Sequence, residues 1–254
     1  MKTCWRHRAL IGALVTRQLN ARYRGSILGF LWTFLNPIFL MLIYALVFRV
    51  YMRFDMDHYP AFVFAGLLPW IWFTTSMSEG TNSLIANGNL ITRAMFPPEI
   101  LPVVAVIANL MNFVFTIPVL LVVFLISGIP FGWQLAWLPV IVAIQCIFTL
   151  ALTFLFAALN VPFRDVQHLL TNALTFWFFL CPILYPLERV PDILKPVALG
   201  NGMGTLVTSY QNIFVHQQGP GIAALFAMLF GSLLLLVLGD AVFRHYRDTF
   251  AEYL

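Results

Sequence analysis

Long apolar runs without charged residues alternate along the chain with shorter polar stretches that contain Gly, Pro and charged residues. Residues 27–48, 61–78 and 100–163 contain no Asp, Glu, Lys or Arg. A helix needs about 20 apolar residues to cross a hydrocarbon core of about 30 Å, so the third run is long enough for two crossings. The turn-forming stretch 128–134 divides that run, because Gly and Pro interrupt helices.

The pattern predicts an all-α integral membrane protein with six transmembrane helices, which form a single domain over residues 1–254. Helices are expected because lipid offers backbone groups no hydrogen-bond partners, and the runs lack the alternation of a transmembrane β-barrel. The predicted spans lie near residues 27–50, 61–82, 100–127, 135–160, 166–187 and 221–243.

Three further segments do not fit plain spans. Residues 83–98 are polar. The sequence alone favours two structures for them equally: a solvated loop, or a helix docked into an ATPase subunit. Residues 188–220 mix charged and apolar residues, and they can fold back into the membrane only where protein buries them. Residues 1–25 are basic and predict an amphipathic helix in the membrane interface. Its apolar face consists of Trp5, Leu10, Ile11, Leu14, Val15 and Leu19.

The composition supports a membrane protein, since 61% of the residues are hydrophobic and 9% are charged. A soluble domain is typically about 45–50% apolar and about 25% charged. The basic cluster before the first span indicates orientation and contact with anionic lipid rather than nucleic-acid binding. With the N-terminus inside, ten basic residues lie on the cytoplasmic side and four outside, which favours both termini in the cytoplasm.

The chain carries no recognisable catalytic motif, so we expect neither an enzyme nor a cofactor or metal site. Its three cysteines lack CxxC spacing, which argues against zinc and against a disulfide framework. Glu79, Asp165 and Asp240 are isolated along the chain, whereas a membrane-embedded glycan enzyme needs several carboxylates together. The spans hold essentially no ionisable residues of the kind that mark ion pathways. Energy for transport must therefore come from a partner.

Three motifs carry a resemblance to a known family. They are RYRGSILGFLWTFLNP at residues 22–37, NGNLITRAMFPPEILP at 87–102 and NVPFRD at 160–165. In this order and spacing they resemble permeases of the type-2 ABC exporter family, in the branch that exports polysaccharides and polyol phosphates. The likeness extends over nearly the whole chain. The first motif is more similar to O-antigen and teichoic-acid permeases than to capsule permeases.

The resemblance implies a homodimer of six-helix subunits in the bacterial cytoplasmic membrane, with two separate ABC ATPase subunits that bind the ATP and Mg. It implies a polysaccharide linked to undecaprenyl diphosphate as the substrate, and a channel at the dimer interface. It also implies re-entrant gate helices within residues 188–220. The coupling segment that contacts the ATPase would contain Leu90, Arg93, Phe96, Pro97 and Glu99.

Other residues are candidates for contact with the substrate. Arg17, Arg22 and Arg24 lie where a lipid diphosphate would arrive, and equally where basic residues anchor a protein at the inner membrane surface. Arg164 and Asp165 are expected to form a local, structural ion pair. Aromatic faces suit sugar rings, although each ring could instead pack in the core or face lipid. The channel candidates are Trp32, Phe34, Tyr44, Trp70, Trp72, Trp177, Phe178 and Tyr185.

The sequence leaves open two alternatives to the export of an O-antigen-like polysaccharide. One is a type-2 permease for teichoic acid, capsule, a drug or a small lipid, because the sequence does not give the channel width. The other is a membrane assembly subunit that transports nothing and needs no ATPase.

Overall fold

The computed structural model describes residues 6–22, 24–94, 96–247 and 249–253, without the side chains at 93, 94, 251 and 252. All regular elements in these ranges are helical. In chain order they are α2 (Arg8–Arg22), η1 (Gly29–Leu31), α3 (Trp32–Ala45), η2 (Leu46–Tyr51), α4 (Tyr59–Ala86), α5 (Gly88–Ala94), α6 (Ile100–Ile126), η3 (Trp133–Trp137), α7 (Leu138–Asn160), α8 (Val166–Leu180), η4 (Leu187–Arg189), α9 (Lys195–Gly200), α10 (Gly202–Gln211), η5 (Asn212–His216), α11 (Ile222–Arg247) and α12 (Phe250–Tyr253).

The prediction of an all-helical membrane protein is confirmed for the described residues. Five helical stretches are long and apolar enough to cross a bilayer: Gly29–Tyr51, α4, α6, Trp133–Asn160 and α11. The predicted break in the long third run is present too. Helix α6 ends at Ile126, and Gly128 adopts a positive φ of 71°, a conformation that glycine reaches without strain.

Helix α8 is shorter than the predicted span over residues 166–187. It has 15 residues, which at about 1.5 Å each reach roughly 22 Å, less than a hydrocarbon core of about 30 Å. Cys181, which follows the helix, is extended with ψ 141° because it precedes Pro182. The residue before a proline is pushed out of the helical region. Whether α8 completes a sixth crossing stays a prediction.

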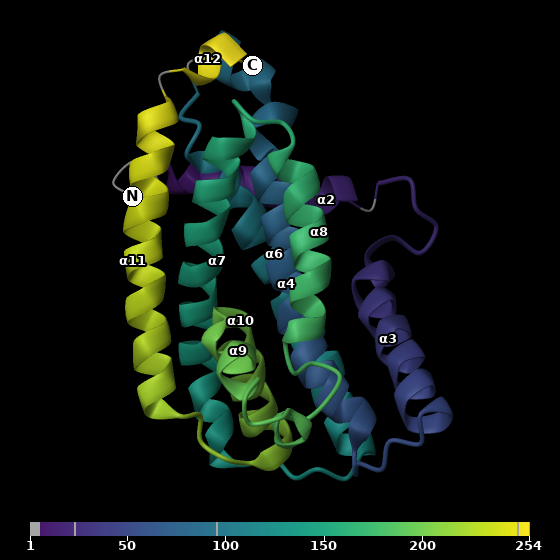
Figure 1. Cartoon of the computed structure of the whole chain (residues 1–254). Coiled ribbons are helices and arrows are strands. Elements are labelled where there is room, and N and C mark those ends of the chain that lie inside the picture. Colours follow the sequence, from purple (N-terminus) through teal and green to yellow (C-terminus); the bar gives the residue numbers. More distant parts are fainter. Residues whose placement is uncertain (1–5, 23, 95, 248, 254) are drawn as a thin grey trace.

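Helix α4 forms the centre of the bundle. In the most apolar 18 residues of α4, 78% of the residues are buried, compared with 17% for the stretch Gly29–Tyr51 and 22% for α11. Figure 1 shows the consequence, with α3 and α11 at opposite edges and α4 between them. A side-chain amide strengthens this core, because Gln145 of α7 donates a hydrogen bond to the Pro69 carbonyl of α4 at 2.8 Å.

Helices α7 and α11 pack closely along their lengths. Gly239 makes this possible, because a Cβ atom there would lie 2.6 Å from the carbonyl oxygen of Ala151. Ala151 and Ala158 of α7 are fully buried, and small residues let helix backbones approach closely in membranes. This edge of the bundle is therefore tightly packed and apolar.

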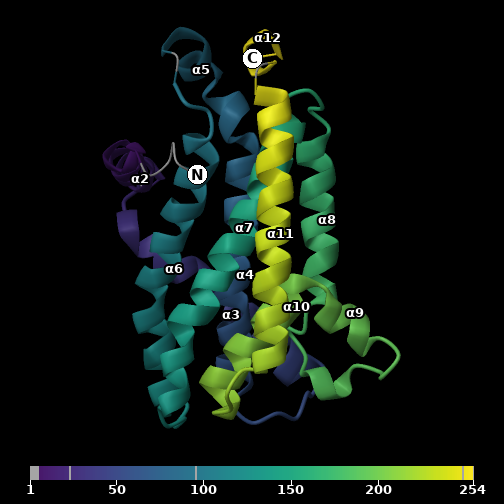
Figure 2. The ribbon, with the colours of Figure 1, turned by 90° about the vertical axis from the view of Figure 1, so that its left-hand side faces the viewer.

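Helix α2 runs across the long helices near one end of the bundle, sideways in Figure 1 and nearly end-on in Figure 2. Ile11 and Val15 are buried in a hydrophobic cluster with residues of α6, α7 and α11, and Leu10, Leu14 and Leu19 pack against it. The predicted apolar face of this helix is thus the face that docks, except for Trp5, which lies outside the described residues.

The segment after α8 folds back among the helices at the opposite end from α2 (Figure 1). Tyr210 and Met203 of α10 are fully buried. Side chains satisfy the backbone of the reversal between α8 and η4. Tyr59 donates to the Leu184 carbonyl at 2.8 Å, and Gln211 donates to the Pro182 carbonyl at 2.9 Å. Irregular backbone is tolerated at membrane depth only when protein buries and satisfies it in this way.

Candidate functional site

Two hollows lie between helix α3 and the rest of the bundle, one toward α6 and the other toward α8, and both reach the central helix α4. Each has a volume of about 520 Å³. Ile71 and Thr75 of α4 contribute to both. Because two hollows separate α3 from the bundle, the stretch Gly29–Tyr51 contacts the bundle less extensively than the other long apolar stretches, as its low buried share shows.

The α3–α8 groove is the hollow between α3, α4 and α8. Aromatic and hydroxyl side chains line it together, the combination that suits a sugar polymer, whose rings have apolar faces and hydroxyl rims. Its lining residues are Leu40, Tyr44, Leu67, Trp70, Ile71, Thr74, Thr75, Ser78, Thr171, Leu174, Thr175, Phe178 and Phe179.

Helix α8 presents a polar stripe on its exposed side. Thr171, Asn172 and Thr175 are all exposed, and they lie within one turn of one another. The hydroxyl groups of Thr171 and Thr175 bond to the carbonyls four residues earlier, but the Asn172 amide has no such partner. Polar side chains rarely face lipid, so in a membrane-spanning α8 this stripe would contact water or another protein surface.

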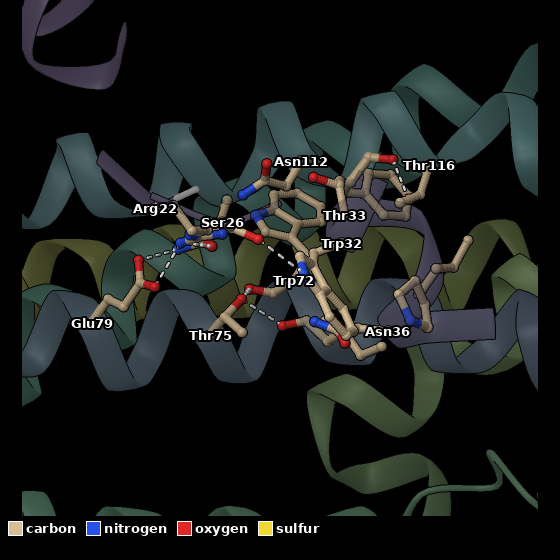
Figure 3. Close-up of a pocket in the computed structure, with 15 residues that line it drawn as sticks. Arg22, Ser26, Trp32, Thr33, Asn36, Trp72, Thr75, Glu79, Asn112 and Thr116 are labelled. Atoms are coloured by element: carbon tan, nitrogen blue, oxygen red, sulfur yellow. Dashed lines mark hydrogen bonds and ion pairs between the residues drawn. The ribbon is translucent and has the colours of Figure 1, made fainter. Parts of the chain in front are cut away.

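The α3–α6 cavity is the second hollow, between α3, α4 and α6 (Figure 3). Its wall is rich in amides and hydroxyls as well as aromatic rings. The lining residues are Arg22, Ser26, Trp32, Thr33, Asn36, Pro37, Leu68, Ile71, Trp72, Thr75, Glu79, Asn109, Asn112, Phe113 and Thr116.

An ion pair closes one end of the α3–α6 cavity. Arg22, the last residue of α2, donates to Glu79 of α4 at 2.6 Å and to the side-chain oxygen of Asn109 at 2.9 Å. Gln18 and the Asn109 amide donate to the other Glu79 oxygen, at 3.0 and 2.9 Å. These contacts tie the surface helix to α4 and α6, and Figure 3 shows Arg22 and Glu79 facing each other.

This cluster changes the interpretation of Arg22, whose position in the sequence makes it a candidate ligand for a lipid diphosphate. The guanidinium already has a carboxylate partner, so its charge is neutralised within the chain. Arg17 and Arg24 are exposed and remain free to meet an anionic lipid group. Glu79 looks like an isolated carboxylate in the sequence, because its partners Arg22 and Asn109 lie 57 and 30 residues away.

The eight predicted channel aromatics separate into three groups. Tyr44, Trp70 and Phe178 line the α3–α8 groove, and Trp32 and Trp72 line the α3–α6 cavity. The remaining three side chains make contacts within the protomer. Phe34 packs edge-on against Phe30 at 5.2 Å, Trp177 donates to Asn201 at 2.9 Å and Tyr185 donates to the Phe179 carbonyl at 2.7 Å.

The predicted coupling residues lie around α5, at the same end of the bundle as α2 (Figure 2). Leu90 and Phe96 are half-buried, and the Arg93 side chain lies outside the described part. Glu99 is not available as a surface contact, because its carboxylate is buried and accepts a hydrogen bond from Arg247 at 2.8 Å. Pro97 is half-buried beside it.

The predicted ion pair between Arg164 and Asp165 does not form among the described residues. Both side chains are exposed, and the four ion pairs in the described ranges join other residues. The same motif has a different structural role. Asn160 accepts a hydrogen bond from the Gln167 backbone at 3.1 Å and donates to the Thr81 carbonyl, so it links the turn before α8 to α4.

Comparison with known proteins adds independent evidence. Residues 9–215 match the family model described as ABC-2 type transporter. The chain is 45% identical over 254 residues, 99% of its length and 98% of the relative's, to the O-antigen export system permease protein RfbA of Myxococcus xanthus. It is 29% identical over 246 residues to a protein of the same name from Klebsiella pneumoniae, covering 96% and 95% of the two chains. It is 23% identical to the polysialic acid transport protein KpsM of Escherichia coli over 238 residues, 92% of each chain.

Proposed function

The chain belongs to the ABC-2 type transporter family, and from this premise we propose that it is the permease subunit of an O-antigen polysaccharide exporter. A permease of this family is a multi-pass membrane protein that works with a separate ATPase subunit. The chain is therefore not itself an enzyme, and ATP and Mg bind to the partner. The proposed substrate is a polysaccharide carried on undecaprenyl diphosphate, which crosses the bacterial cytoplasmic membrane.

The observation that carries this proposal is the α3–α8 groove. A polymer that slides must meet many weak contacts rather than a few strong ones, and the groove offers aromatic faces and hydroxyl groups without a charged residue. The relatives named for O-antigen and for polysialic acid both act on polysaccharides by name, which supports a glycan rather than a small lipid or drug.

We propose further that two copies face each other across α3 and α8. In one protomer the groove is open on its outer side, and the exposed stripe of Thr171, Asn172 and Thr175 continues it. A second copy placed there would remove this stripe from lipid and close the groove into a channel. The buried α10 and the segment 188–220 would then form the outer mouth, as expected for re-entrant gate helices.

Coupling to ATP hydrolysis would pass through α5 and α4. Helix α5 follows α4 after a single residue, and α4 runs 28 residues without a break to the groove and beyond it. A push on α5 by the ATPase would thus be transmitted along α4 to Trp70 and Thr74. The excess of basic residues near α2 and α12 supports both termini in the cytoplasm, on the side of the ATPase.

A gene deletion tests the function directly. We expect cells without this chain to lose surface polysaccharide and to accumulate the lipid-linked polymer inside, with both effects reversed by the wild-type gene. Immunoblots of whole cells and of the cytoplasmic fraction would measure the two pools. Normal surface polysaccharide in the deletion strain would overturn the glycan proposal in favour of a small-lipid substrate or an assembly role.

A pair of matched variants tests the groove. Thr175→Trp places a bulky ring in the α3–α8 groove, whereas Val237→Trp places the same ring on the exposed apolar face of α11. We expect Thr175→Trp to reduce surface polysaccharide strongly at an unchanged membrane level of the protein, and Val237→Trp to export normally. Equal export by both variants would remove the groove from the pathway.

A further inference from the structure

We propose that a clamp formed by α11 and α12 positions the coupling helix α5 for the ATPase. The α11–α12 clamp consists of Phe243, Arg247 and Phe250, and it holds residues 96–99, which join α5 to α6. The inference rests on the proposed coupling role of α5, and it adds a second support that lies 148 residues away in the sequence. Figure 2 shows α5 and α12 at the same end of the bundle, where the two helices are in contact.

Helix α5 is too short to hold its own position. It has seven residues, whereas isolated helices shorter than about 12–15 residues are only marginally stable in water. Its position must therefore come from its neighbours, and it packs against α12 as well as against α4. Ile91 of α5 and Phe96 after it pack against the hydrophobic cluster that contains Phe243 and Phe250. Loss of the clamp would remove one of these two supports.

Three phenylalanines link the clamp to the closely packed edge of the bundle. Phe250 and Phe243 are fully buried and meet edge to face with ring centroids 5.3 Å apart. Phe243 makes the same kind of contact with Phe154 of α7 at 5.2 Å. The Thr249 hydroxyl donates to the Tyr246 carbonyl at 2.7 Å and stabilises the turn between α11 and α12. Because close packing resists deformation, the α7–α11 pair gives the clamp a firm base.

An ion pair holds the end of the coupling segment. Arg247 donates to Glu99 at 2.8 Å, and the Glu99 side chain is only 11% exposed. Glu99 directly precedes α6, where the helix dipole favours a carboxylate. Loss of the arginine would leave this carboxylate buried without its cation, which is costly. Pro97 and Pro98 lie just before Glu99, and their fixed φ angles stiffen the connection toward α5.

The two supports act on opposite ends of α5. Only Asn87 separates the start of α5 from α4, and the residues that follow α5 are held by the clamp. A push by the ATPase therefore turns α5 about the clamp and displaces the end of α4. Without the clamp the push shifts the whole segment, and less of the motion reaches α4. The clamp residues are thus positioning residues, which act on the ATPase contact through α5.

Hydrogen–deuterium exchange tests the positioning step without the ATPase. Mass spectrometry of the purified chain in nanodiscs would follow the α5 amides, with those of α10 as an internal reference. We expect Arg247→Met to raise the exchange rate of α5 at least about fivefold, because local opening becomes easier, and to leave α10 unchanged. Arg244→Met is the matched control, since Arg244 lies on the same helix and pairs with Asp240 outside the clamp. It should exchange as the wild type does.

Surface polysaccharide, membrane level and thermal midpoint report the functional consequence. We expect Arg247→Met to keep its membrane level and midpoint but to lower surface polysaccharide about fivefold, in proportion to the fraction of α5 that stays in position. Arg247→Lys keeps the cation and should restore both slow exchange and export. Phe250→Ala should act as Arg247→Met does, with Phe230→Ala on the exposed side of α11 as its control. Arg247 is exposed at the surface, so its variant provides the test if Phe250→Ala does not fold.

The outcomes separate the clamp from the proposed function. Unchanged exchange of α5 in Arg247→Met would overturn the clamp and leave the proposed function untouched. Faster exchange with normal export would overturn both the clamp and the coupling route through α5. Loss of Arg247→Met from the membrane, or an equal rise of exchange in α10, would assign these residues to folding alone. The deletion experiment stands apart, because it measures whether the chain exports polysaccharide at all.

Discussion

The two edges of the bundle are built differently. At one edge, α11 packs closely on α7 through Gly239, and its exposed side is apolar from Phe226 to Leu238. At the other edge, two hollows separate α3 from the bundle, and α8 exposes Thr171, Asn172 and Thr175 among its apolar residues. Both edges are exposed in a single protomer, yet their chemistry differs.

The two edges therefore suit different surroundings. The α11 edge suits lipid, and the α3 and α8 edge suits a polar partner. Lipid tails are as apolar as Leu, so the α11 edge needs no partner. An exposed amide and hydroxyl at similar depth would be costly in hydrocarbon. Close packing also resists deformation, whereas a helix flanked by hollows can shift without breaking a packed core. The α3 and α8 edge is therefore the edge expected to move and to meet the substrate.

The largest effect is expected from an arginine placed in the middle of each exposed helix. Leu234→Arg puts the charge on the lipid-facing side of α11, at a cost of roughly 2.5–3.5 kcal/mol on insertion scales. Asn172→Arg puts the same charge on the polar stripe of α8, where water or a second copy can receive it. We expect the first variant to be largely lost from the membrane and the second to remain but to export poorly.

Quantitative immunoblots of the membrane fraction, normalised to messenger RNA, would measure this contrast. If both variants were lost equally, α8 would face lipid, and the proposed channel surface would have to lie elsewhere. If both were retained, the exposed side of α11 would be an interface as well.

Much of this fold is predictable from the sequence, because a helix that crosses lipid must have a minimum length and a high mean hydropathy, and single residues change neither. The five long spans and the break at 128–134 follow directly. The end of α8 does not, because the apolar pattern continues to Tyr185 while Pro182 stops the helix. Hydropathy treats proline as another apolar residue, but the physical limit is its missing N–H and its effect on the preceding residue.

The site was predicted only in part. Aromatic candidates were chosen by residue type, and the structure sorts them into the groove, the cavity and internal contacts. No sequence signal could separate these groups, because each depends on which helices are neighbours. The pair of Arg22 and Glu79 is a similar case. Its members are 57 residues apart, and nothing local in either segment indicates the other.

An intermediate effect is expected from adding one methyl group at the tight edge. Gly239→Ala forces a Cβ atom to 2.6 Å from the Ala151 carbonyl oxygen, so α11 must move away from α7. Overpacking of this kind typically costs about 1–3 kcal/mol. Gly231→Ala on the same helix meets no atom within 4 Å and serves as the control.

Thermal unfolding in detergent, followed by circular dichroism, would measure the two glycine variants. We expect a lower midpoint for Gly239→Ala, and for Gly231→Ala a midpoint equal to that of the wild type or higher. Equal midpoints would show that α7 and α11 separate at little cost, and the contrast between a rigid and a mobile edge would fail.

The smallest effect is expected from the ion pairs, one at each edge. Glu79→Gln removes the partner of Arg22 beside the hollows, and Asp240→Asn removes the partner of Arg244 on α11. The Glu79 side chain is 38% exposed, so screening limits the expected loss to about 1 kcal/mol or less. The Asp240 pair is an exposed i,i+4 pair, for which about 0.3–0.5 kcal/mol is typical.

The Glu79→Gln change should loosen α2 locally rather than destabilise the whole protein, because the ion pair links α2 to α4 outside the tightly packed core. We expect Glu79→Gln to speed proteolytic cleavage in the exposed stretch 24–28, and Asp240→Asn to leave that rate unchanged. In the double variant Arg22→Met and Glu79→Gln the effects should be less than additive, since each change removes the same contact. Additive rates would mean that Arg22 and Glu79 hold the surface helix independently, and that Asn109 and Gln18, rather than the ion pair, set its position.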